Sequence, residues 1–452
     1  MPTTIQDLPE ELLVEIASHV PDKHDLSSVS KAGSDPLKRV FQEQLFSNIS
    51  LDCPQRPFCK LFSLVHSPKP ATREGLASRI KTVDIRNTHS ESLASWNDSS
   101  FTQITPREVA HTLFRLPRLK TLQFTYTTFD WDGLKPRQIR KILALFCRPT
   151  LNNLTDLSLP NKRFPLCVLP FCRNIQFLDM QDYLADTTVM LNEKNHPCLP
   201  ERLNTLPLSS TPVSLERLHL AGLALISYFT RFASQDRNIS CRAVDLHYLD
   251  GLVNGTAQGG APSDIVGRFF QNIGGSIEVM RLHVTRFKYD NGTKISSDDL
   301  LSLVQLTSLE LTLTVDMVTS ESNIVACLTD WLFPLLRTFI QLPNIKCLTV
   351  TYDIRVMRYA ASPDLGTLPK ALIKLDSLLA TSPLQEFNCY VAVTRANRIC
   401  EHGMGCWKGR ALQDVAPTQR LSESFCKSVQ VGIKVSVMIF DFTCTEGNST
   451  VE

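Results

Sequence analysis

The residues best suited to bind a metal ion lie near the C-terminus. Cys400, His402 and Cys406 place three potential ligands within seven residues. A structural zinc site needs four ligands, and no fourth follows at a zinc-like spacing. Cys167 and Cys172 are only five residues apart, but no second pair accompanies them, which favours buried thiols. We therefore expect no metal site and no cofactor.

Short catalytic motifs are also absent. The sequence contains no G-x-S-x-G, no G-x-x-x-x-G-K-[ST], no G-x-G-x-x-G and no H-E-x-x-H. It also has no C-x-x-C pair, which small zinc-binding modules use. We therefore expect a chain that is not an enzyme. A triad assembled only in three dimensions stays open, because sequence alone does not reveal it.

Composition indicates a folded chain that is too long for one hydrophobic core. It has 452 residues, of which 43% are hydrophobic. Forty-seven Lys and Arg oppose 45 Asp and Glu, so the net charge of +2 indicates no nucleic-acid partner. No signal-like N-terminus and no stretch of 18 apolar residues occurs, so we expect no membrane partner and a cytoplasmic or nuclear location. The 14 cysteines are scattered, which predicts reduced, mostly buried thiols.

The first fifty residues predict three short helices. Asp7 is a candidate cap for the first helix and Pro9 suits its first turn. A second helix is expected from Asp25 and a third over residues 37–46, each with apolar residues at helical spacing. So small a unit cannot bury all of this apolar surface itself, so we expect part of it to face a partner.

These residues resemble an F-box of the fungal type. The resemblance is carried by Leu8-Pro9-x-Glu11-Leu12-x-x-x-Ile16, Val20-Pro21, Asp25-Leu26-x-x-Val29-Ser30 and Leu45-Phe46-x-x-Ile49-x-Leu51. It implies docking onto the Skp-type adaptor of a cullin complex. The adaptor-binding residues that it implies are Leu8, Pro9, Leu12, Ile16, Leu26 and Val29. The chain departs from the family at residues 33–36, where we expect Pro36 to break or delay a helix.

A repeated L-x-x-L-x-L unit fills the rest of the chain. Nine units span residues 80–85, 119–124, 154–159, 175–180, 215–220, 277–282, 306–311, 345–350 and 384–389, with a weaker one at 244–246. Each unit ends in the alternation typical of a short strand. Their centres lie 21 to 62 residues apart. The pattern therefore indicates an internal repeat. The alternative is that L-x-x-L-x-L occurs by chance in a Leu-rich chain.

Helical patterns lie between the units, at residues 106–116, 136–147, 223–233, 263–273, 297–306, 324–340 and 370–379. Alternation of helix and strand predicts an α/β fold with one parallel sheet and helices behind it. The units resemble the degenerate leucine-rich repeats that commonly follow an F-box. We expect an F-box-like domain at residues 1–51, a connection at 52–78, an irregular leucine-rich-repeat solenoid at 79–445 and a disordered tail at 446–452.

The polar residue near the end of each unit is expected to point away from the core. The candidates are Asp84, Gln123, Ser158, Asp179, His219, Arg281, Glu310 and Thr349. In a solenoid such positions line a face that binds a partner. The Gly-rich residues 250–262 predict a mobile loop, and residues 431–440 predict a final strand.

The hypothesis that follows is a substrate-recognition subunit of a Skp/cullin/F-box ubiquitin ligase, which bridges the adaptor and an unknown protein substrate. The catalytic step of ubiquitin transfer would belong to other subunits. One alternative is a leucine-rich-repeat scaffold that is not coupled to ubiquitination, in which the first helices only cap the solenoid. Another is an unrecognised enzyme.

Overall fold

The computed structural model describes residues 8–20, 22–52, 61, 77–86, 102–125, 127–129, 131, 133–147, 152–159, 164–181, 212–234, 239–249, 262–285, 302–317, 333–357, 368–396, 407–411 and 424–444. Several predicted features lie outside these residues. They are Asp7, most of the connection at 52–78, the Gly-rich loop up to residue 261, the Cys400 to Cys406 cluster and the tail at 446–452.

The chain divides into two compact units. The first comprises Met1–Leu184 with Thr188–Val213, and the second comprises Ser214–Glu452 with Ala185–Thr187. Both units are α/β: parallel strands form the sheet and helices connect them. The three N-terminal helices belong to the first unit.

The three predicted N-terminal helices are present. They are α1 (Glu10–Ser18), α2 (Lys23–Ala32) and α3 (Asp35–Ser47). Pro9 occupies the N-cap of α1 rather than its first turn. The Asp22 carboxylate accepts a hydrogen bond of 2.7 Å from the backbone N–H of His24, so α2 begins two residues before the predicted Asp25.

Pro36 begins α3 instead of breaking it. It lies in the first turn of the helix, after the N-cap Ser34. At that position proline disrupts no helical hydrogen bond, because the first backbone N–H groups have no intrahelical acceptor. Residues 33–36, where the sequence departs from the F-box pattern, therefore contain the boundary between α2 and α3.

Among the described residues, the main sheet of the first unit has five parallel strands in the order β1-β2-β4-β6-β7. Their bounds are β1 (Asn48–Asp52), β2 (Thr82–Arg86), β4 (Thr121–Thr125), β6 (Asp156–Leu159) and β7 (Phe177–Gln181). The register aligns the central residues of the predicted units, because Val83 pairs with Leu122, Leu122 with Leu157, and Leu157 with Leu178. β3 (Thr102–Ile104) and β5 (Thr127–Phe129) form a separate parallel pair.

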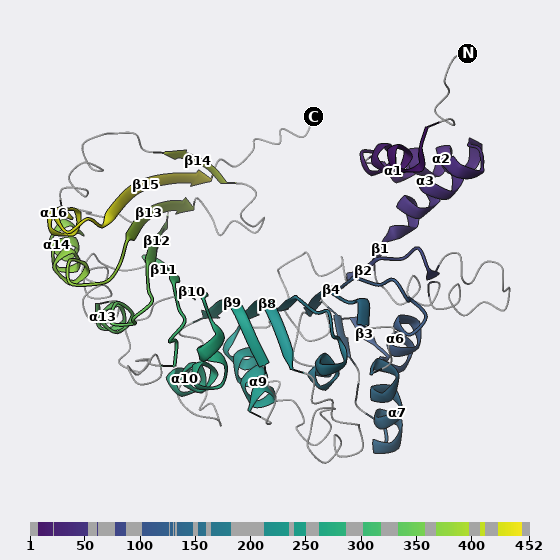
Figure 1. Ribbon diagram of the computed structural model, residues 1–452, viewed down its shortest axis with the longest axis horizontal. Helices are drawn as coiled ribbons and strands as arrows, with labels where there is room; N and C mark the ends of the chain where they lie inside the picture. The colour runs from purple at the N-terminus through teal and green to yellow at the C-terminus, as the bar shows by residue number, and fades with distance from the viewer. Residues whose placement is uncertain are drawn as a thin grey trace. The chain divides into compact units, whose positions relative to one another are not determined.

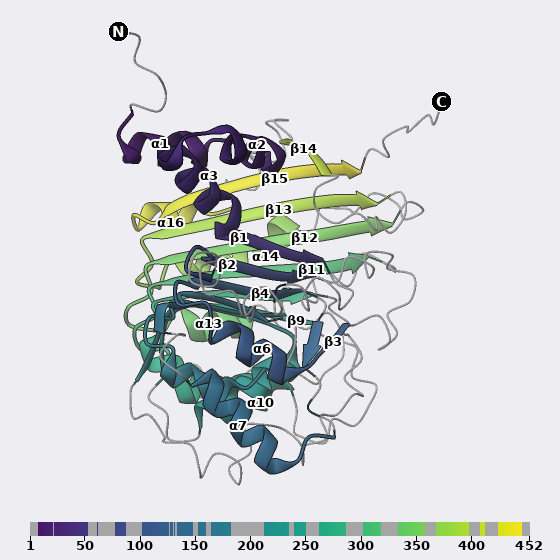
Figure 2. The ribbon, with the colours of Figure 1, turned by 90° about the vertical axis from the view of Figure 1, so that its right-hand side faces the viewer.

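The second unit has the strand order β8-β9-β10-β11-β12-β13-β15-β14. The strands are β8 (Val213–Ala221), β9 (Ile239–Leu249), β10 (Val279–Thr285), β11 (Ser308–Met317), β12 (Cys347–Met357), β13 (Glu386–Ala396), β14 (Trp407–Ala411) and β15 (Lys434–Cys444). The centres align again: Met280 pairs with Val244 and with Leu309, and Leu348 pairs with Leu309 and with Phe387. Figure 2 shows β11, β12, β13 and β15 as neighbouring arrows that point the same way. Only the edge strand β14 runs antiparallel within this described sheet.

A backbone hydrogen bond recurs at the residue immediately before several strands. Lys120 donates its N–H to the carbonyl of Lys81 at 2.7 Å, and Thr155 donates to Lys120 at 2.8 Å. The second unit repeats this contact from Lys346 to Thr307 and from Gln385 to Lys346, each at 2.8 Å. The predicted units are therefore structurally equivalent.

Helices cover one face of each sheet. The first unit has α6 (Pro106–Leu113) and α7 (Pro136–Phe146), and the second has α9 (Leu223–Ala233), α10 (Pro262–Ile273), α13 (Phe333–Phe339), α14 (Leu368–Leu379) and α16 (Cys426–Gln430). In Figure 1 the helices of the second unit all lie on the same face of its sheet. Central strand residues such as Leu309, Leu348 and Phe387 are fully buried. The core of the second unit lies between strands and helices.

Two connections differ from the predicted helices. Leu157 and Leu178 are separated by only 21 residues, and a 3-10 helix, Leu166–Phe171, replaces an α-helix there. Residues 302–306, the described end of the pattern at 297–306, form turns. Within the described residues, a 3-10 helix therefore lies between β6 and β7, and turns lead directly into β11.

The central strand positions should dominate stability. Leu348→Ala removes a fully buried side chain and leaves a cavity, so we expect it to lower the free energy of unfolding by about 2–5 kcal/mol. The adjacent Thr349→Ala, on a partly exposed residue, is the matched control and should cost less than about 1 kcal/mol. Urea unfolding of the full chain measures both, and equal losses would contradict the assigned strand faces.

The buried thiols should be unreactive in the folded protein. Cys172, Cys241 and Cys389 are buried and free, and burial raises the pKa of each thiol to about 12. Because the thiolate is the reactive form, these residues should resist iodoacetamide at pH 8 while exposed Cys426 is alkylated. Mass spectrometry before and after unfolding measures this difference. Rapid native labelling of Cys389 would contradict its placement.

Candidate functional site

The three N-terminal helices form a small hydrophobic core of their own. Its buried residues are Leu13, Ala17, Leu26, Leu37, Val40 and Phe41, and Leu8, Val20, Val29 and Leu45 pack against them partly buried. An ion pair between Arg39 and Glu10 joins α3 to the start of α1. Two members of α1, Leu13 and Ala17, are fully buried. The other residues of α1 are left to face outward.

The six predicted adaptor-binding residues divide into three groups. Pro9, Leu12 and Ile16 are exposed, with 51% of Leu12 and 36% of Ile16 accessible. Leu8 and Val29 are partly buried against the helical core. Leu26 is only 5% exposed and belongs to that core. Pro9, Leu12 and Ile16 thus lie on the surface, whereas Leu26 is part of the hydrophobic core of the three helices.

Leu12 and Ile16 form one apolar stripe along α1, here called the α1 stripe. Residues four apart lie on the same helical face, so these two side chains are neighbours. Val14 is also half exposed, but at about 100° per residue it lies on the opposite flank of the helix. The α1 stripe is therefore distinct from the other exposed apolar side chain of this helix.

The helix that supports α1 runs directly into the sheet of the first unit. α3 ends at Ser47 and β1 begins at Asn48. Arg79 donates a hydrogen bond of 2.7 Å from its guanidinium to the Gln42 side chain, and the Lys81 ammonium lies 3.2 Å from the Glu43 carboxylate. Ile49 and Leu51, the last residues of the predicted N-terminal domain, pair with Val83 and Ile85 in the sheet. The helix that packs against α1 is thus joined to the strands without an intervening loop.

The polar residues predicted to point outward form rows on the strands. Asp84 pairs with Gln123, Gln123 with Ser158, and Ser158 with Asp179 in the first unit. In the second unit Arg281 pairs with Glu310 and Glu310 with Thr349. The Arg281 guanidinium lies 2.8 Å from the Glu310 carboxylate. Polar side chains therefore line this face, although Asp84 is only 6% exposed and pairs with Arg86.

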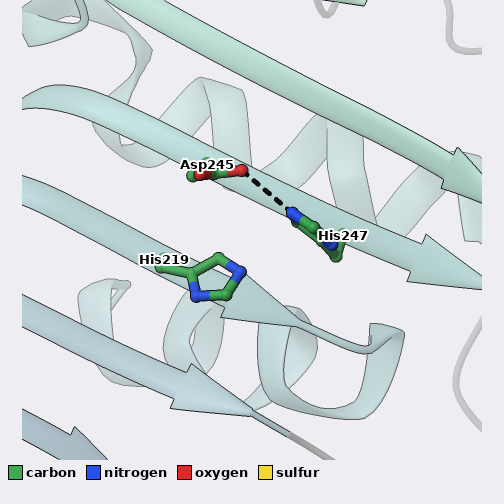
Figure 3. A group of neighbouring side chains, drawn as sticks. All are labelled: His219, Asp245 and His247. Carbon is green, nitrogen blue, oxygen red and sulfur yellow. Dashed lines mark ion pairs between the residues drawn. The ribbon is translucent and has the colours of Figure 1, made fainter. Parts of the chain in front are cut away.

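A polar cluster on β8 and β9 extends this row in the second unit. Figure 3 shows His219 on β8 beside Asp245 and His247 on β9. The potential ligand atoms of these three residues all lie within 4.8 Å of one another. The His247 Nε2 lies 3.2 Å from one Asp245 carboxylate oxygen, and Arg217 lies 3.1 Å from the other.

Backbone geometry fixes the two strands of this cluster. Asp245 and His247 are two residues apart, so both side chains leave β9 on the same face. Gly222, at the end of β8, has φ of +113° and donates its N–H to the His247 carbonyl at 2.7 Å. A side chain at position 222 would strain this turn. The hydrogen bond therefore holds the end of β8 beside His247.

Burial and neighbouring side chains shift the pKa values of Asp245 and of the adjacent His283. Burial raises the pKa of Asp245, but hydrogen bonds from His247 and Arg217 outweigh this effect and lower it to about 2. His283 on β10 is the register partner of His247, with 4.5 Å between the ring centroids. Burial and the neighbouring His247 lower the pKa of His283 to about 4. Asp245 is thus ionised and His283 neutral at neutral pH.

Sequence reasoning selected His219 as an outward residue but missed its partners. Asp245 and His247 follow it by 26 and 28 residues, and local ligand motifs do not have this spacing. A signal was present, because a D-x-H alternation on a predicted strand places both groups on one face. What the sequence lacked was the pairing of β8 with β9.

Comparisons with protein-family models and with curated proteins assign this chain to no family. No protein-family model matches the sequence, and no curated protein matches it. Among the described residues, no helix has both the length and the apolar character needed to cross a bilayer. The function is therefore inferred from the chain's own surfaces.

Leu26 should stabilise the three-helix core rather than contact a partner protein directly. Because its side chain is buried within the three-helix core, we expect Leu26→Ala to destabilise that core by about 2–4 kcal/mol. Hydrogen exchange of the α1 to α3 amides, followed by mass spectrometry, measures the loss of protection. Ser28→Ala, at an exposed position of the same helix, is the control. Unchanged protection in Leu26→Ala would contradict its place in the core.

Proposed function

We propose that this chain is the substrate-recognition subunit of a Skp/cullin/F-box ubiquitin ligase. In this proposal α1 to α3 bind a Skp-type adaptor, and the strand and helix units behind them hold a protein substrate. The exposed α1 stripe carries the proposal. Leu12 and Ile16 expose apolar surface on a helix whose buried apolar residues, Leu13 and Ala17, already fill a core. Apolar surface that remains beside a filled core favours a protein partner.

The remainder of the chain is proposed to be an irregular leucine-rich-repeat solenoid. Support comes from the coincidence of all nine predicted units with strands, and from the alignment of their central residues. The recurring backbone hydrogen bond before the strands adds to this support. Stacked units of this kind bury apolar residues on the helical side and leave the other strand face available for a partner.

The mechanism in this proposal is proximity. The N-terminal helices hold the chain on the adaptor, and the repeat region holds the substrate, so that a substrate lysine reaches a high effective concentration near the ubiquitin-conjugating enzyme. The direct connection of α3 to β1 favours this role, because a rigid link preserves the geometry between the two binding partners. The chain itself forms no covalent bond to ubiquitin in this scheme.

The substrate surface is proposed to be the polar strand face. It carries alternating charges, including Arg281 beside Glu310 and Arg217 beside Asp245. The Arg281–Glu310 pair is exposed on both sides, and exposed ion pairs contribute little to folding stability, so these two residues are available for recognition at modest cost. Mixed charges on a broad surface suit a protein substrate better than one small ligand.

Charge substitutions on α1 test the adaptor site. Leu12→Asp and Ile16→Asp place a carboxylate in the proposed apolar interface, so we expect each to weaken binding to a purified Skp-type adaptor by at least about 30-fold. Surface plasmon resonance with the full chain measures the affinity. These substitutions are preferable to Leu8→Asp, because Leu8 also packs against the helical core.

The matched control is Val14→Asp on the same helix. Val14 is 50% exposed, nearly the same as Leu12, but lies on the opposite flank. It should leave adaptor affinity within about threefold. If the wild-type chain does not bind the adaptor, or if all three variants bind it equally, the ligase proposal fails. A scaffold that is not coupled to ubiquitination would then explain the repeats.

A further inference from the structure

We propose that His219, Asp245 and His247 form a binding site for a divalent transition-metal ion of the zinc type. The site lies on β8 and β9 within the second unit (Figure 3). It does not depend on the ubiquitin-ligase proposal, because it uses neither the α1 stripe nor an adaptor. Its fourth coordination position is taken by water or by a side chain of a protein bound to this strand face.

The donor atoms select the class of ion. Two imidazoles and one carboxylate provide two nitrogen ligands and one oxygen ligand. Magnesium and calcium prefer oxygen ligands alone, whereas imidazole suits zinc, copper, iron and nickel. Three protein ligands with one open position are also the arrangement of zinc sites that exchange a ligand. The composition of the cluster therefore favours a zinc-type ion over the hard cations.

The distances allow one ion to contact all three side chains. Zinc bonds to nitrogen and oxygen of about 2.0–2.2 Å place neighbouring tetrahedral ligand atoms roughly 3.3 Å apart. The His247 Nε2 and Asp245 carboxylate oxygen are already 3.2 Å apart, and no pair of ligand atoms in the cluster is farther than 4.8 Å. A shift of about 1.5 Å by the His219 side chain would complete the geometry, which is within the reach of side-chain rotation.

The surroundings of the site resemble the outer shell of a metal centre. Arg217 holds one oxygen of Asp245 at 3.1 Å and leaves the other oxygen directed to His247. Hydrogen bonds to a ligating carboxylate orient it, although the charge of Arg217 also repels a cation. His283 packs against His247 on the far side from His219, with 4.5 Å between the ring centroids. The ligands therefore come from rigid strands with supported side chains.

Metal titration of the full-length chain tests the site. The probes are Zn²⁺ alone, in competition with a chromophoric chelator, and Co²⁺ alone, both in the presence of a phosphine reductant. We expect one tight equivalent per chain and a cobalt spectrum without a thiolate charge-transfer band, because the ligands are nitrogen and oxygen. His219→Asn and His247→Asn should each weaken zinc binding by at least about 100-fold.

The matched control is His19→Asn. His19 Nε2 lies 2.9 Å from the Glu15 carboxylate on α1, so this pair has a similar histidine-to-carboxylate distance but lacks the third ligand. Removing it should leave the tight equivalent within about twofold. A tight equivalent that survives both His219→Asn and His247→Asn would overturn the proposal. A thiolate charge-transfer band would also overturn it, since cysteines would then hold the ion.

Arg217→Gln separates metal binding from damage to the fold. It removes the cation that opposes the ion while leaving all three ligands, so we expect zinc affinity to rise about threefold to tenfold. An unfolded, reduced chain binds zinc through its exposed cysteines, so the gain must come with a cobalt spectrum that lacks a thiolate charge-transfer band. No gain in a variant whose circular dichroism matches the wild type would contradict the assigned position of the ion beside Asp245.

Discussion

The buried row of central strand residues is the constraint on which each unit of this protein depends. In the second unit Met280, Leu309, Leu348 and Phe387 stand in register on successive strands, and each is fully buried. A slip of one residue in any strand would turn its apolar side chains to the opposite face and expose them to water. The same register brings a backbone N–H before each strand to the preceding carbonyl, so burial and hydrogen bonding favour one alignment.

This constraint also separates structural from functional residues. Because alternate side chains point to opposite faces, fixing the apolar row on the helical side leaves the polar row on the other side. Arg281 beside Glu310 and His219 beside Asp245 and His247 follow from this alternation. Helices cover the buried face of the second unit (Figure 1), so the polar side chains gather on the face that a partner or an ion can reach.

The α1 stripe has a different physical origin. The three N-terminal helices are short, and their core takes only Leu13 and Ala17 as buried residues of α1. Leu12 and Ile16 cannot reach that core, because a helix presents only one side to its neighbours. They remain exposed on α1. The neighbouring helix α3 is tied to the first strands through the contacts of Gln42 with Arg79 and of Glu43 with Lys81. The apolar stripe and the polar strand face are thus products of two separate packing arrangements.

The spacing of apolar residues along the chain was enough to predict most of the described strands and helices. Apolar spacing is local, and each of the nine L-x-x-L-x-L units coincides with a described strand, whereas β1, β3, β5 and β14 were not predicted. The sequence also grouped six apolar residues as one adaptor-binding set, although Leu26 lies in the helical core and Leu12 lies on the surface. Only the tertiary structure made this distinction, because burial depends on which neighbours a helix acquires. The meeting of His219 with Asp245 and His247 was likewise decided by strand pairing across 26 residues of sequence, which no local pattern encodes.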